Sequence, residues 1–196
     1  MKNLCKYALI AAVVLSVLFL LRILAITGAV KLSSVLSISI SFLAEALFLG
    51  LFCWLLSITS SSKSPIAKPA LLCTIGYAAL TAGSCLMAFV SGAMIKEITL
   101  DSIGTWFAVD RGIETVGALL AAGGLGWMAK YFTKGSSQQI ATYVLASVLI
   151  LTTCLSLSSF YLTNTAQATK IYNTTYISIG FIAQIFFMFE FSKLKR

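Results

Sequence analysis

The sequence predicts an all-α integral membrane protein, a bundle of six transmembrane helices with both termini on the cytoplasmic side. Of its 196 residues, 59% are hydrophobic and only 10% are charged, whereas soluble domains average about 25% charged residues. The apolar residues form runs of roughly 20 residues or more, the length that a helix needs to cross a hydrocarbon layer of ~30 Å. We therefore expect a single transmembrane domain over residues 1–196.

Six apolar runs follow one another, and polar or charged stretches separate them. The expected helices are residues 7–30, 35–58, 70–95, 104–132, 140–162 and 171–191. Between them stand Lys31, a serine-rich stretch with Pro65, an acidic loop with Glu97 and Asp101, and the Lys134-Gly135 pair. Every backbone polar group in hydrocarbon must be satisfied within its own segment, so the runs are expected to be helices. A signal peptide is the alternative for the first run, but Arg22 interrupts it and no good cleavage site follows.

The basic residues set the expected orientation, because Lys and Arg concentrate in cytoplasmic loops. One set of helix ends carries nine of them: Lys2, Lys6, Lys63, Lys68, Lys130, Lys134, Lys193, Lys195 and Arg196. The opposite set carries Lys31, Lys96 and Lys170. The richer set, which includes both termini, is predicted to face the cytoplasm, in a multi-pass protein of the plasma or inner membrane.

Composition excludes several classes of function. The net charge of +8 is spread singly over loops and ends, so membrane orientation explains it better than nucleic-acid binding does. The five cysteines show no pairing or metal-ligand spacing. The sequence contains no histidine, which removes the commonest metal ligand and general base. We expect no catalytic residue, no metal site and no cofactor, and we do not expect an enzyme.

Five charged residues lie inside the runs at similar depth, in the outer half of the predicted bundle. Arg22, Glu45 and Glu114 stand about 12–15 Å below the outer ends of their helices, and Asp110 and Arg111 lie one turn above Glu114. A charge in hydrocarbon is costly, so these side chains should face the bundle and pair. One interpretation is a set of structural ion pairs, Arg22 with Glu45 and Arg111 with Glu114. The other is a site for a small polar or zwitterionic ligand or an ion, and a third is a proton or ion relay.

Small residues continue the charged faces. They share one side of their helices at spacings of three and four and predict close helix packing: Gly117, Ala121 and Gly124 below Asp110 and Glu114, and Gly76, Ala79 and Gly83 in the preceding helix. On the second helix, Ser37, Ser41 and Glu45 line one face. The glycine stripe is predicted to pack against another helix of the same chain.

The leading hypothesis is a small membrane transport or ligand-capture component with its site at Arg22, Glu45, Asp110, Arg111 and Glu114. In size, helix number, topology and outer-half pocket the chain is similar to the substrate-binding subunits of energy-coupling-factor vitamin transporters, a likeness of architecture and not of motif. The resemblance implies a partner membrane subunit, which Ala8 and Ala12 on the first helix would contact. The alternative is a non-transporting membrane module, a sensor, an immunity or defence subunit or an assembly factor, whose buried ion pairs are structural. The lipid bilayer is the one partner expected on either view.

Overall fold

The computed structural model describes residues 2–30, 34–62, 64–93, 100–162 and 166–194, and these residues contain helices and turns but no strand. The helices, in order, are α1 (Lys2–Ile26), α2 (Ser34–Ser61), α3 (Ala67–Ala93), α4 (Leu100–Met128), the 3-10 turn η2 (Ala129–Tyr131), α5 (Ser137–Leu162) and α6 (Ala166–Ser192). Each helix contains one predicted apolar run or most of it. The predicted all-helical fold is therefore confirmed.

Two helices end four residues earlier than expected: α4, at Met128, and the first helix. It was expected to continue to Val30, but α1 ends at Ile26, and Gly28 follows with a φ of +83°. Glycine adopts this left-handed conformation without steric cost, so it ends a helix even where the neighbouring side chains remain apolar. A second such glycine, Gly135 with a φ of +76°, lies between η2 and α5.

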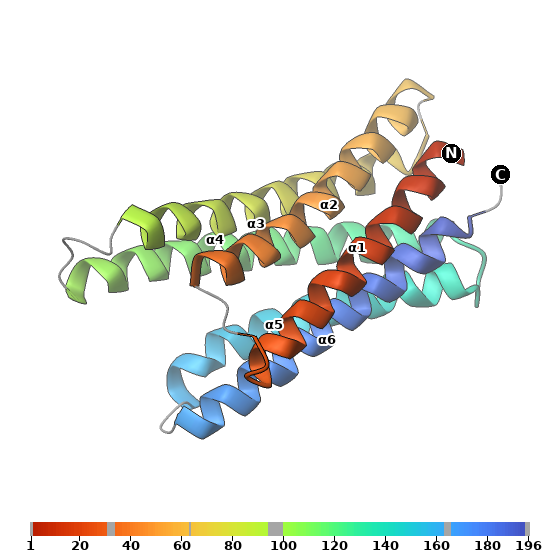
Figure 1. The fold of residues 1–196 in the computed structure, drawn as a ribbon. Helices are drawn as coiled ribbons and strands as arrows, with labels where there is room; N and C mark the ends of the chain where they lie inside the picture. The colour runs from red at the N-terminus through yellow and green to blue at the C-terminus, as the bar shows by residue number, and fades with distance from the viewer. Residues whose placement is uncertain (1, 31–33, 63, 94–99, 163–165, 195–196) are drawn as a thin grey trace.

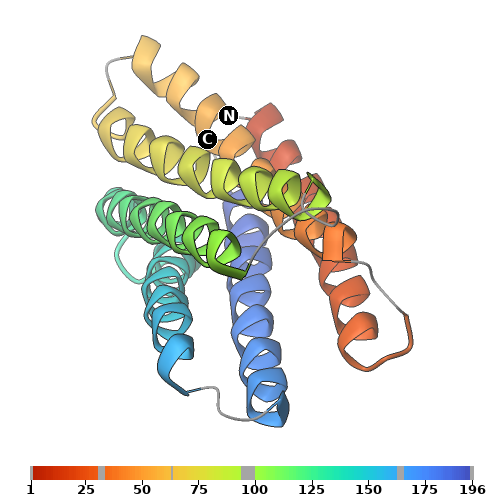
Figure 2. The same cartoon turned by 90° about the vertical axis from the view of Figure 1, so that its left-hand side faces the viewer.

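The helices form a closed ring in chain order. Each packs on the next one along the chain, and α6 returns to pack on α1. Figures 1 and 2 show that the two termini lie close together at one end of the bundle. At that end the Cys5 thiol donates a hydrogen bond to the Leu194 carbonyl oxygen over 3.5 Å. Short connections between consecutive helices favour such neighbour-to-neighbour packing.

The outer surface of the ring is apolar. Ile10 and Leu20 on α1 are 63% and 61% exposed, and Val116 on α4 is 57% exposed. Five helices, α1 to α5, contain described stretches long and apolar enough to cross a membrane. The described side chains of α6 give a shorter apolar stretch, Ile177–Ser192. The chain is thus built as a multi-pass membrane protein with at least five such helices in its described part.

Helices α3 and α4 approach each other most closely, at the predicted small residues. A Cβ added at Gly76 would lie 2.5 Å from the Ala121 backbone nitrogen and 2.6 Å from the Gly117 carbonyl oxygen. One added at Gly117 would lie 2.8 Å from the Gly76 carbonyl oxygen. Real Cβ atoms do not come this close, so glycine is required on both sides of the contact. The prediction that the α4 stripe packs within the chain is confirmed, and its neighbour is α3.

Candidate functional site: a charged cavity inside the bundle

A cavity of about 150 Å³ lies in the middle of the bundle, between residues of α2, α3, α4, α5 and α6. Its polar lining consists of Ser41, Glu45, Arg111, Glu114, Thr115, Thr152, Thr153 and Gln184. The remaining lining is apolar and includes Leu80, Leu149 and Phe181. An engineered cavity of similar volume in another protein holds a molecule the size of benzene, so the space suits a ligand of about six non-hydrogen atoms.

Three of the five predicted site residues line this cavity: Glu45, Arg111 and Glu114. Glu45 lies about 16 Å along α2 from its first residue, and Glu114 about 21 Å along α4. The sequence placed these charged residues at a similar depth, and in the structure charged groups of the two helices do line the same cavity.

The predicted pair between Arg111 and Glu114 is confirmed. The Arg111 Nη1 atom lies 2.7 Å from the Glu114 Oε2 atom, across one turn of α4. The Arg111 side chain is 28% exposed and the Glu114 side chain is 27% exposed. The pair thus borders the cavity and is not sealed within apolar packing, so water or a ligand can reach it.

The predicted pair between Arg22 and Glu45 is wrong. Arg22 Nη1 instead donates to the Ser37 carbonyl oxygen over 3.2 Å and also to the Ser37 hydroxyl. Ser37 lies about 12 Å nearer the first residue of α2 than Glu45 does. The long arginine side chain extends towards the polar end of the bundle, as such side chains do in membranes. Arg22 therefore lies outside the cavity lining.

Glu45 has a partner that the sequence did not indicate. The Ser84 hydroxyl of α3 donates a hydrogen bond to Glu45 Oε2 over 2.7 Å. This is the one hydrogen bond recorded for Glu45 in the described part of the chain, and no cation pairs with it there. A single neutral donor leaves most of the acceptor capacity of a carboxylate unused. Glu45 is thus the least satisfied charged group on the cavity wall.

Asp110 is close to the cavity but does not line it. Its side chain is 1% exposed, and its Oδ1 atom has no hydrogen-bond partner among the described residues. A Cβ added at Gly83 would lie 3.1 Å from this oxygen, so the glycine of α3 makes room for the carboxylate. The same Cβ would lie 3.4 Å from the Glu114 Cγ atom, and Ser84, the residue after Gly83, bonds Glu45. Three carboxylates therefore share one layer of the bundle.

Helices α5 and α6 contribute polar groups that sequence reasoning missed. Thr152 and Thr153 line the cavity, and both hydroxyls donate to the Leu149 carbonyl oxygen, over 3.1 and 2.7 Å. Gln184 of α6 lines the same cavity. The available signal was the position of these polar residues in the middle of apolar runs. The sequence does not tell how each helix is rotated about its own axis, so it could not show that these residues face the same cavity.

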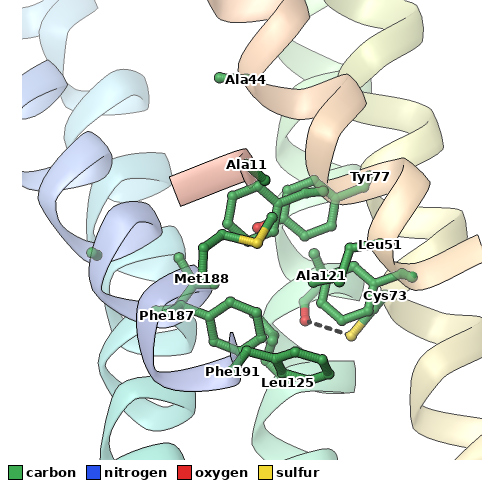
Figure 3. Close-up of a cluster of buried hydrophobic side chains, with 14 of the residues drawn as sticks. Ala11, Ala44, Leu51, Cys73, Tyr77, Ala121, Leu125, Phe187, Met188 and Phe191 are labelled. Atoms are coloured by element: carbon green, nitrogen blue, oxygen red, sulfur yellow. Dashed lines mark hydrogen bonds between the residues drawn. The ribbon is translucent and has the colours of Figure 1, made fainter. Parts of the chain in front are cut away.

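Aromatic rings fill the bundle between the level of Glu45 and the end that carries the termini, and Figure 3 labels Tyr77, Phe187 and Phe191 among them. This aromatic layer consists of Phe48, Phe52, Tyr77, Phe187 and Phe191, all of them at most 3% exposed. Tyr77 stacks on Phe48 with ring centroids 4.9 Å apart and on Phe52 at 5.5 Å. Phe48 lies one turn below Glu45, and Phe187 one turn below Gln184. The layer therefore lies one turn beyond two cavity-lining residues, on the side of the termini.

The arrangement can hold a small polar or charged molecule, but it does not resemble a metal centre. Among the described residues, no group of three or more acidic or cysteine side chains is placed to bind a metal ion. Comparison with protein-family models, with curated proteins and with solved structures gives no match. The similarity to substrate-binding transporter subunits consequently gains no support from known sequences or folds, and the cavity itself has to carry the functional interpretation.

Proposed function

We propose that this chain is a small membrane transport or ligand-capture component whose ligand enters the cavity from the outer half of the bundle. The observation that carries the proposal is a cavity of about 150 Å³ whose lining includes Glu45, Arg111 and Glu114. Structural charges are normally enclosed and fully paired, whereas Glu45 keeps unused acceptor capacity beside an open space. Pockets with a few convergent polar groups in a mainly apolar wall are typical of small-molecule sites.

In the proposed orientation, six helices of the chain span the plasma or inner membrane, and both termini lie in the cytoplasm. Six of the described basic residues support it, because they lie near the end that carries the termini: Lys2, Lys6, Lys68, Lys130, Lys134 and Lys193. With this orientation the aromatic layer faces the cytoplasm, and the cavity faces the outside. Transport would then need a partner membrane subunit or an ion gradient as its energy source.

The second candidate is a non-transporting membrane module in which the same charges stabilise the bundle. The bonded Arg111–Glu114 pair favours it, because that pair satisfies both groups without a ligand. The two candidates differ in whether the cavity contains water that exchanges with the outside. Measuring the water accessibility of the cavity wall therefore separates them.

Cysteine accessibility is the direct test. In a cysteine-free variant, Thr153→Cys places a thiol on the cavity wall, and Leu151→Cys is the matched control on the same helix, with Leu151 47% exposed on the lipid-facing surface. We expect a small, membrane-impermeant thiol reagent added outside intact cells to label the first variant only, because a thiolate forms only in contact with water. If neither variant is labelled, the cavity is closed to the outside and the non-transporting module is favoured.

A further inference from the structure

We infer that the cavity binds a compact primary ammonium ion, with its charged group on Glu45 and a short apolar chain against the aliphatic wall. This inference rests on the proposed function and specifies the chemical class of its ligand. It depends on three features of the cavity: the charge of its wall, the balance of hydrogen-bond donors and acceptors, and its volume.

The charge of the wall favours a cation. Two carboxylates, Glu45 and Glu114, and one guanidinium, Arg111, line the cavity. The guanidinium already bonds Glu114 over 2.7 Å, and no cation pairs with Glu45 among the described residues. Asp110, 1% exposed, lies in the same layer of the bundle and adds a third carboxyl group. Carboxyl groups thus outnumber cationic groups here, and a cation can take the place of the proton that a buried, unpaired carboxyl group otherwise holds.

The hydrogen-bond balance favours a ligand that donates. Glu45 accepts one bond, from Ser84 over 2.7 Å, and can accept more. The hydroxyl protons of Thr152 and Thr153 are committed to the Leu149 carbonyl oxygen, so these side chains face a ligand as acceptors. An ammonium group offers three donors and no acceptor, which matches this set. A quaternary ammonium, which has no N–H group, would leave these acceptors unused.

The volume and the apolar wall limit the rest of the ligand. About 150 Å³ holds roughly six non-hydrogen atoms. The apolar part of the wall includes the side chains of Leu80, Leu145 and Phe181. A short alkyl chain buries its surface there without leaving polar groups unpaired. Larger amines, such as those with a two-ring aromatic group, exceed this volume.

The test compares three ligands of nearly equal size but different charge: n-pentylammonium, 1-pentanol and pentanoate. Their effect on the melting temperature of the purified full-length protein is measured in phosphate buffer, which contains no amine. At 100 times the dissociation constant, a ligand of the native state should raise Tm by about 5–10 °C. We expect this shift for pentylammonium alone, with a dissociation constant of about 10 μM to 1 mM given the few atoms of the ligand.

Two variants locate the effect. Glu45→Gln should weaken pentylammonium binding about 10- to 150-fold, the factor for loss of one charged hydrogen bond. Its matched control is Glu190→Gln, because Glu190 is also a buried carboxylate of the bundle but pairs with Lys193 over 2.6 Å near the termini. The Glu190→Gln variant should bind pentylammonium with the same dissociation constant as the unchanged protein. Should Glu45→Gln fail to fold, Thr153→Trp, which fills the cavity, takes its place and should abolish the shift.

The outcomes separate the two proposals. A Tm shift with pentanol or pentanoate that Thr153→Trp abolishes would show a binding cavity and overturn the inference of a cation. A shift with pentylammonium that is undiminished in Glu45→Gln would overturn the contact with Glu45, and one that is undiminished in Thr153→Trp would place binding outside the cavity. If no ligand shifts Tm, the cation inference fails, and labelling of Thr153→Cys from outside then decides whether the proposed capture function stands.

Discussion

The contact between α3 and α4 can be tested with two neighbouring glycines on α4. A Cβ added at Gly124 would lie 2.7 Å from the Cys73 Sγ atom and 2.8 Å from both the Cys73 backbone nitrogen and the Pro69 carbonyl oxygen. A Cβ added at Gly123 would have no atom within 4 Å. Replacement by alanine is therefore the same chemical change at both positions, but it creates a steric conflict only at Gly124.

The expected magnitudes follow from these distances. Overpacking costs about 1–3 kcal/mol, and Gly124→Ala belongs near the upper value because two of the three opposing atoms are backbone and cannot rotate away. Alanine also gains up to about 1 kcal/mol of helix propensity over glycine, but both variants share this gain. The difference between them is thus about 3 kcal/mol, or about 6–12 °C in Tm for a chain of this length.

Thermal unfolding of the two purified variants in the same detergent measures this difference. We expect Gly123→Ala to melt at or slightly above the unchanged protein and Gly124→Ala well below it. Equal melting temperatures would mean that α3 and α4 do not approach closely at Gly124. A lower value for Gly123→Ala would mean that the other side of α4 forms the helix contact, and the direction assigned to the glycine stripe would be wrong.

Three further predictions concern orientation, Glu45 and the aromatic layer. Cysteines introduced at positions 60–64 and at the C-terminus should be labelled from the inside and those at 97–101 from the outside; external labelling of the C-terminus would contradict the six-span topology. Glu45→Gln should change Tm by less than about 4 °C, because the amide oxygen still accepts from Ser84; a much larger loss would show that the carboxylate is structural. Tyr77→Phe should raise Tm by about 2–8 °C, because the buried Tyr77 hydroxyl has no partner among the described residues; a lower Tm would reveal a hydrogen bond to a water molecule or a ligand.

The sequence predicted the helices well because their cause is local. A run of apolar residues long enough to cross a bilayer forms a helix whatever its neighbours are. Depth along each helix could also be predicted, since it follows from a fixed rise per residue. This is why Glu45 and Glu114 were expected in one layer, and both line the cavity.

What could not be predicted was the direction in which each side chain points around its helix. Arg22 was matched with Glu45 by depth, yet it bonds Ser37, because a long side chain can reach a different level. Thr153 and Gln184 were not connected with the site, since only the rotations of α5 and α6 bring them to the cavity. Rotation depends on contacts between helices distant in sequence, and those contacts are set by the whole packing arrangement.

The aromatic layer has a consequence for the permeability barrier of the membrane. A cavity about halfway along the bundle shortens the apolar path through a membrane that the bundle spans, and a proton or an ion crosses a thinner barrier more easily. Phe48 and Phe52 of α2 contact Phe187 of α6 at centroid distances of 5.8 and 6.2 Å. These rings fill the space between α2 and α6 at this level, so a solute would have to displace them to pass there. The same rings that fill the core therefore block a direct path from the cavity to the end that carries the termini.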